Sequence, residues 1–232
     1  IIQSNINDDD NIMKQADKLL ELAIENALII EDIFYETKYL DDAYYILGMS
    51  SYYKNRMTAG SYYFNRILNE FVDKDKMYLN KSNIWLGFIE LKTNNIEKLN
   101  IRINQIDVIS LEKDELFLYY QLHAELALFK EDYLNVEKNF LKSLEYTSSK
   151  FDNLYIYNKL LKIAEQEKLY SNSVRYIENI EDNLINNKLT EELLVKWIDY
   201  NIEIKNTSIV LEKLDELIIN NTLKKKDIDY KI

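Results

Sequence analysis

Histidine and cysteine, which most often supply nucleophilic and metal chemistry, are almost absent from this chain of 232 residues. His123 is the single histidine and there is no cysteine, which excludes Cys–His nucleophiles, thiolate sites and His-rich metal clusters. A serine paired with His123 is the nucleophilic arrangement that remains, and the alternative is a histidine packed inside the fold. Without cysteine the chain forms no disulfide, which leaves its redox compartment open.

Acidic residues are the other source of possible chemistry. The run Asp8 to Asp10 resembles part of a calcium loop, but the alternating ligands, central glycine and closing glutamate of such a loop are missing. We predict instead that this run lies at a helix N-terminus, where the helix dipole favours acids. No phosphate-binding glycine loop or zinc-protease motif occurs, and no pair of carboxylates is singled out for acid–base catalysis. The prediction is a noncatalytic protein with no metal and no cofactor.

The charge and hydropathy of the chain limit the classes of partner that it could bind. Forty acids against 29 bases give a net charge of −11, which argues against a nucleic-acid partner. The basic run Lys224 to Lys226 is short, and we interpret it as a solvated helix end or tail. No apolar run of about 18 residues predicts membrane insertion. Because the chain begins at Ile1 and shows no signal peptide, we expect a piece of a longer protein, with any export signal or lipid anchor outside it.

The elements that must position any site are predicted to be helices. The chain has no proline and three glycines, so polar turns of Asn, Asp, Ser and Lys must join its segments. A long helix is expected from Ile12 to about Glu36, covered on more than one side. Its apolar stripe and the residues that widen it are Ala16, Leu19, Leu20, Ala23, Ile24, Ala27, Leu28, Ile29, Ile30, Ile33 and Phe34.

Two glycines mark a tight helical hairpin between Tyr39 and Val72. Gly48 and Gly60 lie inside otherwise helical runs, where each costs about 1 kcal/mol relative to alanine and indicates a close backbone approach. Asn55, in the turn between them, tolerates the left-handed conformation that such a turn needs. We predict similar turns at Asn94–Asn95 and at Glu131–Asp132.

Equivalent positions recur at a nearly constant spacing, as in stacked helical arrays. First-helix positions 39, 37, 37 and 37 residues apart are Gly48, Gly87, Ala124, Leu161 and Ile198. The matching second-helix positions are Gly60, Leu99, Val136, Ser173 and Val210, followed four residues later by Phe64, Ile103, Phe140, Ile177 and Leu214. Tyr133 and Tyr170 share one position at the start of successive second helices.

With Asp41 as repeat position 1, the hairpin resembles a tetratricopeptide repeat: Tyr44, Leu47 and Gly48 match the first helix of that motif, and Gly60, Phe64 and Ile67 match the second. The resemblance implies an all-α fold, a right-handed α-α superhelix of about five to six hairpins forming one solenoid over residues 1–232. Its approximate repeats are 12–40, 41–79, 80–116, 117–153, 154–190 and 191–223. The spacing exceeds the usual 34 residues, the closing proline is replaced by Val72, and the match weakens after residue 150, where a looser helical array is the alternative.

In such arrays the first helices line a concave groove for partners, which implies a set of binding residues. Those residues are Asp42, Tyr45, Met49, Tyr52, Tyr53, Lys81, Ile84, Phe88, Gln121 and Glu125, with Leu91, Lys92, Leu118, Leu128 and Phe129 beside them. We expect Tyr45, Met49 and Phe88 to be exposed, whereas Tyr52 and Tyr53 could equally pack between repeats. His123 falls on position 7, normally a packed leucine.

The expected function is a scaffold that holds a protein or peptide partner in this groove. The segment KYLDDAYYILG is similar to the joint between repeats in bacterial outer-membrane lipoproteins of the β-barrel assembly type, which implies a periplasmic, outer-membrane-associated place. The alternative is a cytoplasmic regulator or peptide sensor built on the same repeats. A hydrolase or transferase, the third class, would need a site that the sequence does not display.

Overall fold

The computed structural model describes residues 2–33, 37–71, 76–185 and 188–219, and side chains within 14–33, 37–71, 78–185 and 188–215. These residues form helices and no strand, which confirms the all-α prediction. The α-helices are α1 (Ile2–Ile33), α2 (Leu40–Tyr53), α3 (Met57–Glu70), α4 (Lys76–Lys92), α5 (Ile96–Gln105), α6 (Lys113–Phe129), α7 (Tyr133–Leu144), α8 (Lys150–Gln166), α9 (Tyr170–Asn183), α10 (Glu191–Glu203) and α11 (Thr207–Ile219). A short 3-10 helix, η1 (Val108–Ser110), precedes α6.

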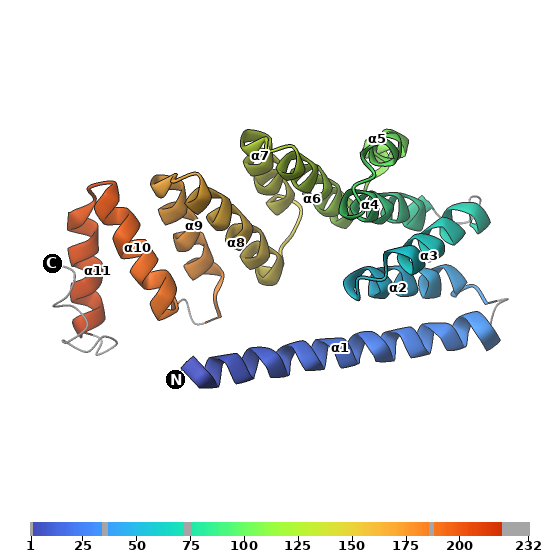
Figure 1. Cartoon of the computed structure of the whole chain (residues 1–232), viewed down its shortest axis with the longest axis horizontal. Helices are drawn as coiled ribbons and strands as arrows, with labels where there is room; N and C mark the ends of the chain where they lie inside the picture. Colours follow the sequence, from blue (N-terminus) through green and yellow to red (C-terminus); the bar gives the residue numbers. More distant parts are fainter. Residues whose placement is uncertain (1, 34–36, 72–75, 186–187, 220–232) are drawn as a thin grey trace. The chain divides into compact units, whose positions relative to one another are not determined.

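The chain divides into two compact units, unit 1 from Ile1 to Leu126 and unit 2 from Ala127 to Ile232. In unit 1 the helices α1 to α5 each pack against the next, and α2 also contacts α4. In unit 2 the helices α7 to α11 pack in the same consecutive way (Figure 1). Each unit is therefore a solenoid-like stack of helical hairpins. A single superhelix over the whole chain stays a prediction.

The turns inside the hairpins confirm the repeat register. Five non-glycine residues have a positive φ, between 56° and 63°, and each follows a first helix. They are Asn55, Asn94, Glu131, Lys168 and Lys205. Each lies seven positions after the corresponding member of the series Gly48, Gly87, Ala124, Leu161 and Ile198, so the backbone repeats with the predicted spacing.

One hydrogen-bond pattern closes all five turns. The amide after the left-handed residue donates to a carbonyl five positions back, as from Arg56 to Ser51 at 2.8 Å and from Leu169 to Ala164 at 2.8 Å. The left-handed residue itself donates three positions back, as from Asn55 to Tyr52 at 3.0 Å. This pair of bonds is the Schellman motif, which satisfies the last carbonyls of a helix. The motif usually uses glycine, and none of these turns has one.

The two glycines of the first hairpin lie where its helices cross. A Cβ atom added to Gly60 would lie 3.3 Å from the Gly48 carbonyl oxygen, which confirms that Gly60 is at the crossing. A Cβ added to Gly87 would likewise lie 3.3 Å from Leu99 Cδ1 in the next hairpin. The equivalent positions in unit 2, Leu161 and Ser173 in one hairpin and Ile198 and Val210 in the other, are all buried.

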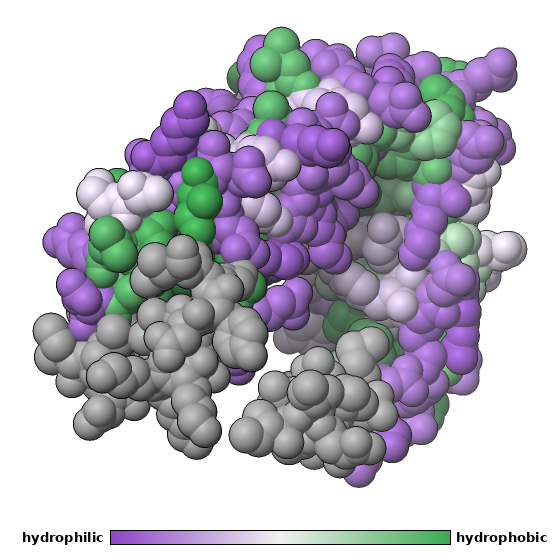
Figure 2. Space-filling model, turned by 60° about the vertical axis from the view of Figure 1, so that its left-hand side comes forward, coloured by the Kyte–Doolittle hydropathy of each residue, from purple (hydrophilic) through white to green (hydrophobic). Residues whose placement is uncertain are grey.

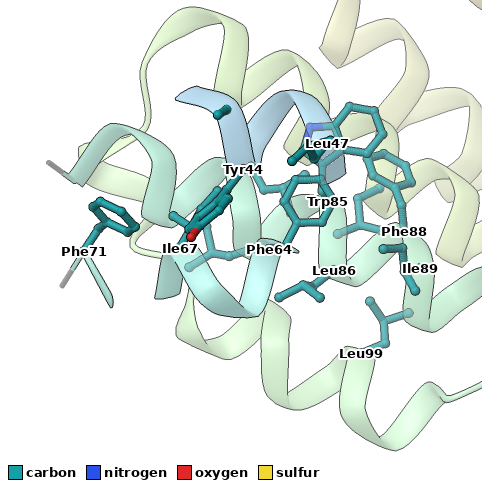
Figure 3. Close-up of a cluster of buried hydrophobic side chains, with 14 of the residues drawn as sticks. Tyr44, Leu47, Phe64, Ile67, Phe71, Trp85, Leu86, Phe88, Ile89 and Leu99 are labelled. Atoms are coloured by element: carbon teal, nitrogen blue, oxygen red, sulfur yellow. The ribbon is translucent and has the colours of Figure 1, made fainter. Parts of the chain in front are cut away.

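Aliphatic and aromatic side chains together fill the core of unit 1 (Figure 3). Phe64 and Ile67 of α3 are fully buried, and the Phe64 ring occupies the space beside Gly48, 2.7 Å from where a Cβ would be. On its other side Phe64 stacks on Trp85 of α4, with centroids 6.3 Å apart. Burial raises the pKa of Tyr44 to about 12, and the Arg66 guanidinium lies 4.2 Å from its ring centre.

The long N-terminal helix differs from its prediction in extent and in burial. It begins at Ile2, so Asp8 to Asp10 lie beyond its first turn. Ala27 is buried, but Leu19, Ile29 and Ile33 are exposed, so within the described structure the helix is covered on one side only. Phe34, Val72 and the residues after Ile219, including Lys224 to Lys226, lie outside the described residues.

Ion pairs hold α1 to the hairpin that follows it. Lys54, in the α2–α3 turn, pairs with Asp17 at 2.9 Å and with Glu21. Arg66 of α3 pairs with Glu31 at 2.7 Å. These contacts anchor the covered face of α1 at two levels.

Tyr133 and Tyr170, predicted to share a position, are the first residues of α7 and α9.

Candidate functional site

The first helices α2 and α4 lie side by side in unit 1 and are joined by polar bridges. The Tyr78 hydroxyl donates to Asp42, and Trp85 Nε1 donates to the Tyr45 hydroxyl at 2.9 Å. Burial raises the pKa of Tyr45 to about 12, so its hydroxyl stays neutral at physiological pH. Asp42 and Tyr45, predicted to face a partner, are therefore engaged in contacts between neighbouring repeats.

Lys81 of α4 makes the corresponding bridge toward α6. Its ammonium group lies 2.7 Å from an Asp114 carboxylate oxygen, and its side chain is largely buried while that of Asp114 is exposed. Lys81 was predicted as a groove residue, and the structure gives it an acidic neighbour within unit 1.

The prediction that Phe88 is exposed was wrong. Phe88 retains 8% of its surface and Ile84 none, because large neighbours enclose both side chains. The Phe88 ring centre lies 5.5 Å from that of Trp85 and 6.3 Å from that of Tyr52 (Figure 3). Tyr45 and Met49 are half-buried against the same core, so neither is as exposed as predicted.

What remains at the surface is the C-terminal end of α2 and the adjoining part of α4. Tyr53 is 59% exposed and makes edge contacts with Tyr52 at 5.6 Å and with Trp85 at 5.8 Å. The ammonium group of Lys92 lies 4.8 Å from the centre of the Tyr52 ring. We call Tyr52, Tyr53, Trp85, Phe88 and Lys92 the aromatic ledge. Buried rings hold an exposed ring and a cation in place there.

The ledge has the chemical character of a binding hot spot. Tyrosine and tryptophan dominate such hot spots because they bury large areas with few rotatable bonds. Tyr52 is half-buried and Tyr53 is exposed, although both rings contact Trp85 of the next first helix; a place in a groove stays a prediction for both. Trp85 was not among the predicted site residues, although a tryptophan one position after Ile84 in a tyrosine-rich repeat was the available signal.

On α6 the predicted residues Gln121 and Glu125 are half-buried. His123, between them, is also half-buried and lies against Tyr119 with ring centres 4.4 Å apart. Gln121 and Glu125 were predicted as groove residues, and their place in a groove stays a prediction; His123 was predicted to be packed, and its contact with Tyr119 agrees with that.

Carboxylates near these helices serve structural roles. Glu115 is 1% exposed, and its carboxylate accepts from the Glu112 amide at 2.8 Å at the start of α6. Burial raises the pKa of Glu115. Within the described ranges, no group of three or more histidine, cysteine or acidic residues could hold a metal ion.

Compared with protein-family models and with curated proteins, the chain matches none. The tetratricopeptide resemblance therefore stays a prediction. No helix within the described ranges is long and apolar enough to cross a membrane. Hydrophilic residues cover most of the face seen in Figure 2.

Proposed function

We propose that this chain is a noncatalytic scaffold that binds a protein or peptide partner through the aromatic ledge of unit 1. The observation that carries the proposal is the exposure of Tyr53 beside buried Trp85 and Phe88. A ring held by packed neighbours loses little conformational entropy when a partner covers it. The ledge thus offers a pre-organised apolar contact with a cation, Lys92, at its edge.

The charge of the chain supports a protein partner over a nucleic acid. A net charge of −11 repels phosphate backbones, and several of the described bases lie in ion pairs, such as Lys81 with Asp114 and Arg66 with Glu31. A periplasmic, outer-membrane-associated place is part of the proposal and is supported by the KYLDDAYYILG similarity alone. The competing proposal is a cytoplasmic regulator. Fractionation of the native host, probed with an antibody to this chain, distinguishes the two.

Site-specific photocrosslinking tests the ledge. A photoreactive phenylalanine derivative at position 53 should capture a discrete partner in the native host. The same derivative at position 62 is the matched control, because Tyr62 of α3 is 55% exposed but belongs to another helix. Capture at both positions equally, or at neither, would contradict the ledge as the binding site.

Truncation measures what the ledge contributes. Tyr53→Ala should weaken binding of the captured partner by about 1–3 kcal/mol if Tyr53 is a hot spot. Because Tyr53 is exposed, the free energy of unfolding should change by less than about 0.5 kcal/mol. Tyr62→Ala should change neither quantity by more than that. Titration calorimetry and urea unfolding provide the two readouts.

A further inference from the structure

The helix α1 carries two apolar faces, and only one is used inside unit 1. The used face includes buried Ala27 and half-buried Ile24 and Leu28, which pack on the core. The other face is formed by four large side chains that are 47–66% exposed: Leu19, Leu22, Ile29 and Ile33. We call these four, together with Asn26, the α1 stripe.

The α1 stripe has the spacing of a coiled-coil seam. Its members follow one another at intervals of three, four, three and four residues, so Leu19, Asn26 and Ile33 take the a positions of a heptad and Leu22 and Ile29 take the d positions. At 100° per residue these five positions lie within one arc of about 80°. Asn26 is exposed, and its amide donates to the Leu22 carbonyl one turn back at 2.9 Å.

We infer that the α1 stripe pairs with the α1 stripe of a second copy of this chain, forming a parallel, in-register, two-stranded coiled coil. An asparagine at a single a position in an otherwise apolar seam specifies two strands and their register. In this arrangement each apolar residue of the stripe meets its own counterpart. Asn26 meets Asn26 of the second copy, where each amide can both donate and accept.

The antiparallel arrangement fits the same residues poorly. The two equivalent antiparallel registers place Asn26 opposite Leu22 or opposite Ile29, and each leaves a buried amide against an apolar side chain. They also bring Glu25, at a g position, against Glu25 or Asp32 of the other copy, whereas the parallel arrangement sets Glu25 beside the e-position Ile30. The sequence around the stripe therefore selects the parallel dimer.

The contacts within unit 1 leave the α1 stripe available. Asp17, Glu21 and Glu31, which form the ion pairs with Lys54 and Arg66, occupy neither a nor d positions. They attach α1 to the hairpin through its other face. The stripe is thus held on an anchored helix, with its large side chains exposed.

The mass of the full chain in solution tests the pairing. Sedimentation equilibrium should show a dimer at micromolar concentration, and the double variant Leu22→Glu with Ile29→Glu should raise its dissociation constant by more than about 100-fold, since four buried side chains per dimer become charged. The matched control, Ile101→Glu with Leu134→Glu, changes two residues that are 60% and 79% exposed elsewhere and should leave the dimer intact. A monomeric wild-type chain would overturn the inference. So would a dimer that survives the stripe variant, including one formed through another surface.

Cysteine crosslinking tests the orientation, because the natural chain has no cysteine. In the parallel dimer, Leu19→Cys and Ile33→Cys should each form a disulfide with the same position of the second copy. In either antiparallel register, equal positions near either end of the stripe lie well beyond the roughly 7 Å between Cα atoms that a disulfide spans. Disulfide-linked dimers from both variants support the parallel pairing. Failure of both in a chain that sediments as a dimer would overturn it.

Discussion

The hairpins α2–α3 and α8–α9 have the same turn geometry and differ in the side chains packed between their helices. Both turns place a left-handed residue at the same position, Asn55 with φ 59° and Lys168 with φ 56°. The crossing of the first hairpin has Gly48 and Gly60, whereas that of the second has Leu161 and Ser173. Turn geometry and register are therefore constant, while side-chain volume is distributed differently between the two helices.

The two hairpins also differ in how they join the next repeat. Aromatic packing and the Trp85–Tyr45 hydrogen bond link α2 to α4. Tyrosine hydroxyls donate to carboxylates in both units, from Tyr78 of α4 to Asp42 of α2 in unit 1, and from Tyr200 of α10 to Glu165 of α8 at 2.8 Å and from Tyr176 of α9 to Glu137 of α7 in unit 2. Unit 1 adds the stack of Phe64 on Trp85, so the loss of an aromatic ring should cost more stability there.

The largest expected effect is the loss of Phe64, the ring that fills the space beside Gly48. Phe64→Ala should cost about 3–5 kcal/mol in the free energy of unfolding. Adding Gly48→Ala to that variant should recover up to about 1 kcal/mol, because the new methyl no longer meets the ring and alanine favours the helix. Urea unfolding of the two single variants and the double variant measures the coupling. A double variant no more stable than Phe64→Ala would contradict it.

A smaller loss is expected when the crossing itself is overfilled. Gly60→Leu should destabilise by about 1–3 kcal/mol, because a Cβ there already lies 3.1 Å from Ile89 Cδ1. Ser173→Ala is the counterpart in α9; it adds no volume and removes one hydrogen bond to the Leu169 carbonyl, so it should cost at most about 1.5 kcal/mol. Equal unfolding midpoints for Gly60→Leu and the wild type would place Gly60 away from the crossing.

Glycine substitutions in the turns should stabilise the protein, and the gain should be larger in the α8–α9 turn than in the α2–α3 turn. A left-handed conformation costs a lysine about 1–2 kcal/mol. Glycine avoids that cost, but because its unfolded state is more flexible, it loses more conformational entropy on folding, which costs about 0.5–1 kcal/mol. Lys168→Gly should therefore stabilise by about 0.5–1 kcal/mol, and Asn55→Gly by less, since asparagine tolerates the conformation. Thermal unfolding provides the measurement, with Lys168→Ala as the control that keeps the strain. A destabilised Lys168→Gly would contradict the turn assignment.

The smallest expected effect is a pH dependence of the free energy of unfolding that has opposite signs for two carboxyl groups. Burial raises the pKa of Glu115, so the folded state binds its proton more tightly and this group loses stability as pH rises from 4 to 7. Hydrogen bonds from Asn135 lower the pKa of Asp132 at the start of α7, so that carboxylate contributes stability above its unfolded pKa and loses it on acidification.

Replacement of each carboxyl should reveal the two opposite slopes. Relative to the wild type, Glu115→Gln should gain stability as the pH rises from about 4 to 7, and Asp132→Asn should lose stability as the pH rises from about 2 to 5, since the unfolded aspartate titrates at about pH 3.9. Chemical unfolding at several pH values gives both differences. Slopes of the same sign for the two variants would contradict the assigned environments.

The nearly constant spacing of equivalent positions made the stack of hairpins predictable. The residue types found in the turns would not have been enough. Asn55 is a residue type that accepts a left-handed turn, but Lys168 and Lys205 are not, and no turn was predicted at either; they follow the predicted turn at Glu131 at intervals of 37 residues. The predicted crossings at Gly48 and Gly60 were confirmed for a related reason, since a glycine inside a helix has few explanations other than close contact.

The site was less predictable, because a positional rule gives the direction of a side chain but not the size of its neighbours. Phe88 points from a first helix as predicted, yet Trp85 and Tyr52 are large enough to enclose it. The helix α1 shows the same limit: the sequence predicted a wide apolar stripe covered on more than one side, but only contacts between helices could show that the chain itself covers one face.

Because the left-handed turn recurs at the same place in each repeat, whole repeats could be removed or added. Removal of residues 131–167 would join α6 directly to the turn that begins at Lys168, and every later residue would keep its place in the repeat. Removal of one residue fewer would leave an extra residue in the turn and break the pair of hydrogen bonds that closes it. Lengthening or shortening of such a chain is therefore constrained to whole repeats, while sequence inside each repeat can diverge as far as Gly48 and Leu161 have.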